Sequence, residues 1–165
     1  MTDGTAKGRI VVGVDGSDAG TAALVWATAQ AEVSGAELDV VTVWTHDGML
    51  DDASVNRTLE EARRVHVDEL EKLVTAVTKG HTGVVARYAA PEGDPADVLT
   101  TRAKEATMLV VGSHGKGKLR EMLAGSVSSA CLRHASCPVA VIPPPAHTPE
   151  STLGRQVAEV ASGKF

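Results

Sequence analysis

The residues that could do chemistry gather in one glycine-rich stretch, VVGSHGKGKLREMLAGSVSS, which begins at Val110. The stretch follows an apolar run that reads as a strand, and it combines glycines with serines and lysines. Glycine lets a ligand lie against the backbone or permits a positive φ, and amide groups turned inward bind anions. The composition therefore predicts a phosphate-binding loop between a strand and a helix.

One candidate motif for this stretch is a P-loop, and it fails at a single position. Gly112–Lys118 matches the first seven positions of G-x-x-x-x-G-K-[S/T]. The eighth position of the motif is Ser or Thr, whose hydroxyl ligates Mg²⁺, but in this chain it is Leu119. The loop also follows the fourth apolar run, whereas a P-loop typically stands near the start of its domain. A working P-loop is therefore not expected.

A longer spacing suits a nucleotide better: Gly112, then Gly115, then Gly125 followed by Ser126. Gly125 inside a helix would cost ~1 kcal/mol relative to Ala. We therefore expect the helix to begin near Gly125, with Ser126 as its cap and with the first amides facing a phosphate. Two lysines, Lys116 and Lys118, either neutralise a phosphate or are simply solvated.

Five short valine-rich runs alternate with segments of helical period, which defines the expected fold. The runs begin at Arg9, Glu37, Thr82, Ala106 and Pro138, and the helical segments span about 18–33, 54–79, 96–105 and 125–134. Runs that hardly alternate polar and apolar residues are typical of strands buried on both faces. We expect a single-domain, doubly wound α/β fold, Rossmann-like, with a parallel sheet, helices on both faces and ligands at the carboxyl ends of the strands.

The ends of the chain differ from the domain expected at residues 9–143. Residues 1–8 are predicted to be disordered. Residues 144–165 start with prolines and carry only a weak apolar pattern (Leu153, Val157, Val160), which predicts a mobile tail with at most a marginal helix. The acidic segment at 46–54 is expected to form a flap at the carboxyl edge of the sheet.

The net charge, the apolar runs and the aromatic content of the chain limit the kinds of molecule that it is expected to bind. A net charge of −5 and a pI near 5.6 disfavour nucleic acid and anionic membranes, and no apolar run approaches the ~18–20 residues of a membrane span. The N-terminal residues are polar and lack the apolar core of a signal peptide. Cys131 and Cys137 are expected to act as small apolar side chains, which fits a reducing cytoplasm. Because aromatic residues make up 2% of the chain, a bound purine would lie between aliphatic side chains.

Several single residues admit two interpretations. Asp15, after the first strand, contacts a ligand or caps a turn. His114 has a positioning or purely structural role, with donation to a phosphate or proton transfer as the alternatives. Trp44 borders the ligand pocket or plugs the sheet edge, and His66 is expected to be a packed or interfacial histidine rather than a metal ligand.

Four landmarks occur together in order: VVGVDGS, EGDPADVL, GSHGKGKLREMLAGSVS and CPVAVIP. Over about residues 8–143 the chain resembles the nucleotide-binding members of the universal stress protein family, whose ATP signature is G-x-x-G-x9-G-[S/T]. The resemblance implies a five-stranded sheet of order 3-2-1-4-5 and a homodimer through the last strand, Pro138–Ile142. Carried over by position, it implies ATP-binding residues at Asp15, Val43, Gly112, Ser113, His114, Gly115, Gly125, Ser126 and Val127.

The function expected from this resemblance is that of a cytoplasmic, nucleotide-responsive regulatory protein in stress adaptation. It would bind ATP with Mg²⁺, act on an unidentified protein partner, and bind neither nucleic acid nor membrane. No catalytic residue and no metal-ligating residue is predicted, so at most slow ATP hydrolysis is expected. A slow ATPase, AMP or cAMP as the ligand, and a dimerisation module without ATP remain open alternatives.

Overall fold

The computed structural model describes residues 7–45, 58–114, 125–143, 146 and 148–163. Strands and helices alternate in the order β1 (Arg9–Gly13), α1 (Asp18–Ser34), β2 (Glu37–Val41), α2 (Leu59–Thr78), β3 (Ala86–Ala89), α3 (Pro95–Arg102), β4 (Met108–Gly112), α4 (Ser126–His134), β5 (Val139–Ile142) and α5 (Thr152–Ser162). All strand pairs are parallel, and the sheet has the order β3-β2-β1-β4-β5. The predicted fold class and strand order are confirmed.

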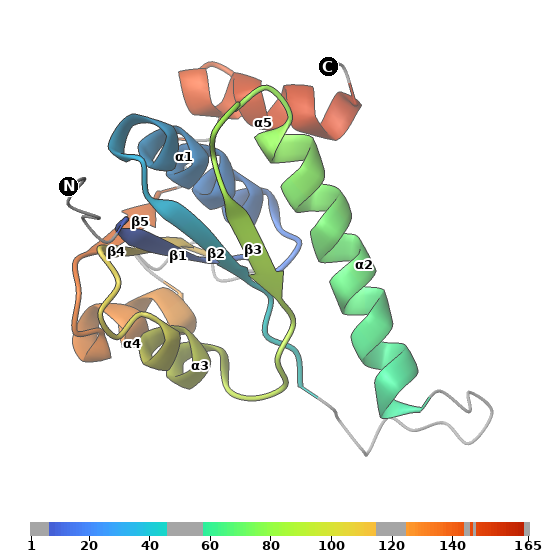
Figure 1. Ribbon diagram of the computed structural model, residues 1–165, viewed down its shortest axis with the longest axis vertical. Helices are drawn as coiled ribbons and strands as arrows, with labels where there is room; N and C mark the ends of the chain where they lie inside the picture. The colour runs from blue at the N-terminus through green and yellow to red at the C-terminus, as the bar shows by residue number, and fades with distance from the viewer. Residues whose placement is uncertain (1–6, 46–57, 115–124, 144–145, 147, 164–165) are drawn as a thin grey trace, which may run out of the picture.

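Helices cover the two faces of the sheet in separate layers (Figure 1). Helices α1, α2 and α5 lie on one side and α3 and α4 on the other. The interiors of the central strands β1, β2 and β4 are almost fully buried, as their valine-rich runs predict. The edge strands β3 and β5 are only half-buried, because each has one neighbouring strand and fewer helices against it.

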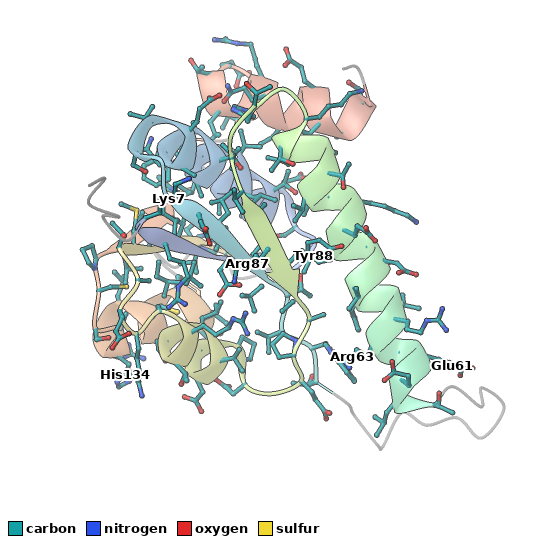
Figure 2. All side chains as sticks on the ribbon, viewed as in Figure 1. Lys7, Glu61, Arg63, Arg87, Tyr88 and His134 are labelled. Carbon is teal, nitrogen blue, oxygen red and sulfur yellow. The ribbon has the colours of Figure 1, made fainter. Side chains whose placement is uncertain are left out.

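Strand β3 begins four residues later than the apolar run at Thr82 suggests. Gly80 and Gly83 adopt φ values of 120° and 97°, a region that favours glycine, so the chain turns there before it extends. Tyr88 of β3 points toward α2 (Figure 2), and a hydrogen bond with Glu71 of that helix raises the pKa of the phenol. The side chain therefore helps to attach α2 to the edge of the sheet.

His66 of α2 is a packed histidine, as expected. Its ring stacks on Trp44 with 5.4 Å between ring centroids and an interplanar angle of 20°. Helix α2 starts with a capping box in which Thr58 and Glu61 exchange side-chain-to-backbone hydrogen bonds. No helix among the described residues is long and apolar enough to cross a membrane.

The C-terminal segment differs from the mobile tail expected for residues 144–165. Helix α5 is capped by Ser151, whose hydroxyl accepts from Gly154 N, and it packs against α1. Val157 is 7% exposed, and Leu153 and Val160 pack against the same core. The apolar residues of the weak pattern thus lie on the face of α5 that packs against α1. Their burial supplies the stability that a short isolated helix lacks.

We predict that Val157→Ala lowers the free energy of unfolding by about 2 kcal/mol, because it removes buried methyl groups and leaves a cavity. Urea denaturation followed by far-UV circular dichroism measures this. Val33→Ala is the matched control, since Val33 is 87% exposed on α1 and its truncation should change the stability by less than about 0.5 kcal/mol. Equal effects of the two substitutions would show that α5 does not fold cooperatively with the domain.

Candidate functional site

A cavity of about 260 Å³ lies over the carboxyl ends of β1, β2 and β4, at the point where the winding direction of the sheet reverses. Ligands of open α/β sheets bind at this place. The first residues of α1, α3 and α4 complete its walls. The structure gathers in this cavity every predicted site residue that it describes: Asp15, Val43, Gly112, Ser113, His114, Gly125, Ser126 and Val127.

Four predicted features lie wholly or partly outside the described residues. They are Gly115, the pair Lys116 and Lys118, the expected flap at 46–54, and residues 1–6 of the N-terminal segment predicted to be disordered.

One part of the cavity is aliphatic. Its walls include Val41, Val43, Leu99, Val111 and Val127. These side chains come from β2 and the segment after it, β4, α3 and α4, and they belong to or pack against one core cluster, so the wall is continuous with the core. A flat apolar ring system fits between such aliphatic walls.

Trp44 does not line this cavity, which decides between its two interpretations. Its indole Nε1 donates to Ala90 O at 2.9 Å, and its ring stacks on His66. The side chain thus lies on the β3 side of the chain and closes the sheet edge.

The backbone of Val43 faces the cavity side of the sheet. The amides of Thr42 and Trp44 donate to Ala89 O (3.1 Å) and Pro91 O (3.2 Å), which lie on the β3 side. Because peptide groups of successive residues in a parallel strand point to opposite neighbours, the N–H and C=O of Val43 point toward β1. These main-chain groups therefore face the side of the strand on which the cavity lies.

Asp15 stabilises a turn, which is one of its two predicted roles, and it also lines the cavity. Its Oδ1 accepts from the backbone N–H of Ser17 at 3.0 Å and also from the Ser17 hydroxyl, while Gly16 takes a φ of 78°. The carboxylate thus stabilises the turn into α1. It is also exposed and lines the cavity, where it can accept hydrogen bonds from ligand hydroxyl groups.

Another part of the cavity wall is polar and includes residues at the end of β4 and the start of α4. The carbonyl of Ser113 accepts from Gly125 N at 2.6 Å and from Ser128 Oγ at 3.2 Å, so the helix start is attached to the end of β4. Ser126 is the first helical residue and not the predicted cap. The N-cap is Gly125, and no described side chain caps the helix.

Helix α4 differs in this respect from the other described helices. Side chains of Ser17, Thr58, Asp94 and Ser151 cap α1, α2, α3 and α5. The first amides of a helix carry partial positive charge and need acceptors. At α4 these amides adjoin the cavity, where an anionic group can accept from them.

Gly112 is required for a reason that the sequence does not reveal. A Cβ at this residue would lie 2.8 Å from both the backbone carbon and the Cβ of Ala19 in the first turn of α1. The missing side chain thus makes room for a helix, whereas the sequence suggested room for a ligand. The close approach brings the start of α1 up to the end of β4.

The two cysteines, Cys131 and Cys137, do not line the cavity. Both are free thiols, and Cys131 is fully buried in the core cluster below the cavity. Burial, together with the nearby Asp94 and Cys137, raises the pKa of the Cys131 thiol to about 11. A buried neutral thiol acts as a small apolar side chain, in agreement with the prediction.

Some lining residues were not predicted from the sequence. Pro95 and Leu99 of α3 belong to the EGDPADVL landmark, whose periodic Pro-x-x-x-Leu spacing could have placed both on one helix face. Gly13 and Gly20 approach Leu99 and Asp15 so closely that a Cβ would meet them at 2.7 Å and 3.1 Å. Such contacts have no signal in a single sequence.

The fold and the cavity together define a doubly wound α/β domain with a cavity at its switch point. The model of the universal stress protein family matches residues 7–143. The chain therefore belongs to the universal stress protein family.

Individual relatives agree with this assignment. A universal stress protein of Mycolicibacterium smegmatis is 33% identical over 135 residues, covering 82% of this chain and 45% of that protein. Universal stress protein Rv2623 of Mycobacterium tuberculosis is 32% identical over 155 residues, covering 86% of this chain and 50% of that protein. The chain spans about half the length of the curated relatives it matches.

Solved structures show the same fold. Universal stress protein UspA from Lactobacillus plantarum superposes with a TM-score of 0.70 at 26% identity, covering 82% of this chain and 97% of that one. A universal stress protein in complex with cAMP superposes with a TM-score of 0.63 at 25% identity, covering 82% of this chain and 96% of that one.

We predict that Gly112→Ala destabilises the protein by about 1–3 kcal/mol, because the added methyl group collides with helix backbone. Thermal unfolding measures the loss. Adding Ala19→Gly should restore only part of the stability, since it removes the contact with the Ala19 Cβ but leaves those with the Ala19 carbonyl group. A single variant as stable as the parent would contradict this account of Gly112.

Proposed function

We propose that this protein binds an adenine nucleotide, with ATP and its Mg²⁺ ion as the foremost candidate, in the cavity at the carboxyl edge of the sheet. Binding would serve a regulatory role in stress adaptation, in the cytoplasm and through a protein partner that reads the nucleotide state. The observation that carries the proposal is the convergence of the described predicted residues on one cavity, which has both aliphatic and polar lining residues.

The aliphatic and the polar lining residues suit the different parts of a nucleotide. Val41, Val43, Val111 and Val127 offer apolar surface for a purine, and the main chain of Val43 is turned toward the same space. Asp15 stands where it can accept from ribose hydroxyl groups. The amides at the start of α4 suit phosphate, and Mg²⁺ would be held by the phosphate oxygens.

The solved relative that contains cAMP supports an adenine nucleotide as the ligand class. The number of phosphates is a separate question, because amides at a helix start bind any anion. AMP or cAMP as the ligand, and slow hydrolysis of bound ATP, are therefore alternatives that keep the same binding site. A protein that binds no ATP and acts only by dimerisation is the alternative that does without it.

The direct test is to purify the protein without added nucleotide, denature it and identify released compounds by chromatography. A stoichiometric adenine nucleotide would support the proposal and count the phosphates. An empty protein that also fails to bind Mg·ATP, AMP and cAMP in titration calorimetry would overturn it.

We predict that Ser126→Asp weakens ATP binding at least about tenfold, because a carboxylate at the start of α4 repels the phosphates. The same substitution should not reduce stability, since an acidic residue is favourable in the first turn of a helix. Thr152→Asp, at the first position of α5, is the matched control and should leave binding unchanged. Calorimetric titration with ATP and adenosine measures the effect, and an equal loss for both ligands would argue against a phosphate site at α4.

We further propose that the protein forms a homodimer through β5 (Pro138–Ile142 in the sequence). Strand β5 pairs only with β4 among the described strands, so its outer edge is open. Leu109 N donates to Pro138 O and Ser113 N donates to Ile142 O, which turns these residues toward β4. By alternation, the N–H of Val141 faces the open edge, where a second copy of the strand could accept from it.

We predict that Val141→Pro converts a dimer into a monomer, because proline removes an outward N–H while leaving the bonds to β4 in place. Size-exclusion chromatography with light scattering gives the mass, and circular dichroism verifies folding. Ala86→Pro on the other edge strand, β3, is the control and should leave the mass unchanged. A dimer that persists in Val141→Pro would place the interface elsewhere.

A further inference from the structure

A second hollow, the Trp44 groove, lies at the carboxyl end of β3 and has a volume of about 470 Å³. None of its lining residues lines the cavity described above, so it is a separate site. The lining comes from Trp44, from the first turns of α2 (Leu59, Glu60 and Arg63), from residues 89–92, and from Arg102 of α3.

The part of α2 that borders this groove is exposed. No residue at 59–69 is buried, whereas Leu70, Val74 and Val77 are, and the first turns of α2 extend past the end of β3 (Figure 1). Exposed apolar side chains gathered in one region indicate a surface that another molecule covers. Of the six large apolar side chains exposed in the described part of the chain, four lie on α2, on β3 or directly before β3: Leu59, Val65, Val85 and Tyr88.

The outer edge of β3 presents main-chain groups that an extended segment can pair with. Thr42 N donates to Ala89 O at 3.1 Å, so the carbonyl of Ala89 faces the β2 side. By alternation, the N–H and C=O groups of Ala86 and Tyr88 point away from β2. No strand lies beyond β3 in the described part of the chain, so these groups are available to an added strand.

The charges along this edge favour a basic segment. A hydrogen bond with Glu71, together with the negative charges of Glu71 and Asp68, raises the pKa of Tyr88, so both carboxylates lie near that side chain. Glu92 lines the groove itself. The ion pairs among the described residues involve none of these three carboxylates. A lysine or arginine of a bound segment would therefore meet carboxylates that have no basic partner.

The main chain connects the Trp44 groove to the proposed nucleotide site. Val43 lines the cavity, and the next residue, Trp44, lines the groove. Trp44 N donates to Pro91 O at 3.2 Å, and Trp44 O accepts from Gly93 N at 3.0 Å. A ligand that contacts Val43 would therefore act directly on the segment that forms the groove.

We propose that the Trp44 groove and the adjoining edge of β3 bind an extended segment of a protein partner, which carries apolar side chains and a lysine or arginine. The segment adds a strand to β3 at Ala86 and Tyr88 and places an apolar side chain beside Trp44 and Leu59. The inference rests on the proposed function in one respect, namely that this partner is the one that reads the nucleotide state.

Docking is tested with the full chain and a phage-displayed library of short random peptides, selected without nucleotide. We expect enriched peptides in which apolar residues alternate with lysine or arginine, and changes in amide NMR shifts centred on Ala86 and Tyr88. Ala86→Pro removes an outward N–H and should raise the dissociation constant at least about tenfold, measured by fluorescence anisotropy. Val141→Pro, on the opposite edge strand, is the matched control and should leave it unchanged. Circular dichroism verifies that both variants fold.

Two side-chain variants make the test independent of proline. Leu59→Ala shortens a side chain that is 52% exposed, so it should weaken peptide binding about fivefold at unchanged stability. Leu132→Ala, at a leucine of α4 that is 55% exposed, is its control and should have no effect. Glu92→Gln should reduce the preference for a basic peptide over its lysine-to-glutamine version about threefold.

Several outcomes would overturn the docking proposal. Peptides that bind Ala86→Pro and Leu59→Ala as tightly as the parent, or that shift amides elsewhere, would place the site on another surface. A selection that enriches nothing, or only acidic or helical peptides, would contradict the extended basic segment. Self-association of the chain that Ala86→Pro abolishes would make a second copy the occupant.

The link to the nucleotide is measured separately, by repeating the peptide titration at saturating ATP. We expect binding to tighten about fivefold, because a nucleotide that contacts Val43 orders the main chain leading to Trp44. A protein that binds ATP without any change in peptide affinity overturns the link. A protein that binds no adenine nucleotide overturns the proposed function, while the titration without nucleotide still decides whether the segment docks at β3.

Discussion

The site depends on how closely two helices approach the end of strand β4. At Gly112 the first turn of α1 comes so near that no side chain fits between Ala19 and the strand. One residue later, the carbonyl of Ser113 accepts two hydrogen bonds from the start of α4. These contacts hold both helix starts at the strand end and so determine the width of the cavity between them. A rigid frame of this kind lets backbone groups act as ligand contacts.

Helix α3, the third helix at the cavity, is held to the sheet by charged side chains. Asp39 of β2 is 8% exposed and accepts two hydrogen bonds from Arg102 of α3, at 3.2 Å from Nε and 2.9 Å from a terminal nitrogen. Arg9 of β1 donates to the carbonyls of Arg102 and Lys104 at the end of the same helix. A partly buried carboxylate is tolerated because the bidentate pair replaces its lost hydration. The pairs orient α3, which carries Leu99 into the cavity wall.

The part of the chain that matches the family and the part beyond it meet in one core. Residues 7–143 contain the sheet and the cavity, whereas Val157 of α5 is buried in the cluster that includes Val12, Leu24 and Ile142. Helix α5 thus supports α1 from outside the family segment. Since Ala19 and Asp15 lie at the start of α1, the support extends indirectly to the cavity.

The sequence by itself determined the alternation of strands and helices, because valine-rich runs and helical periods are local signals. Its landmarks, through the family resemblance, also determined the strand order and the candidate residues from Asp15 to Val127. Tertiary structure alone decided which face Trp44 takes, why Gly112 has no side chain, that Gly125 and not Ser126 is the N-cap of α4, and that α5 docks on α1. Each of these depends on contacts between segments far apart in the chain, and a single sequence records the residue types but not the distances between them.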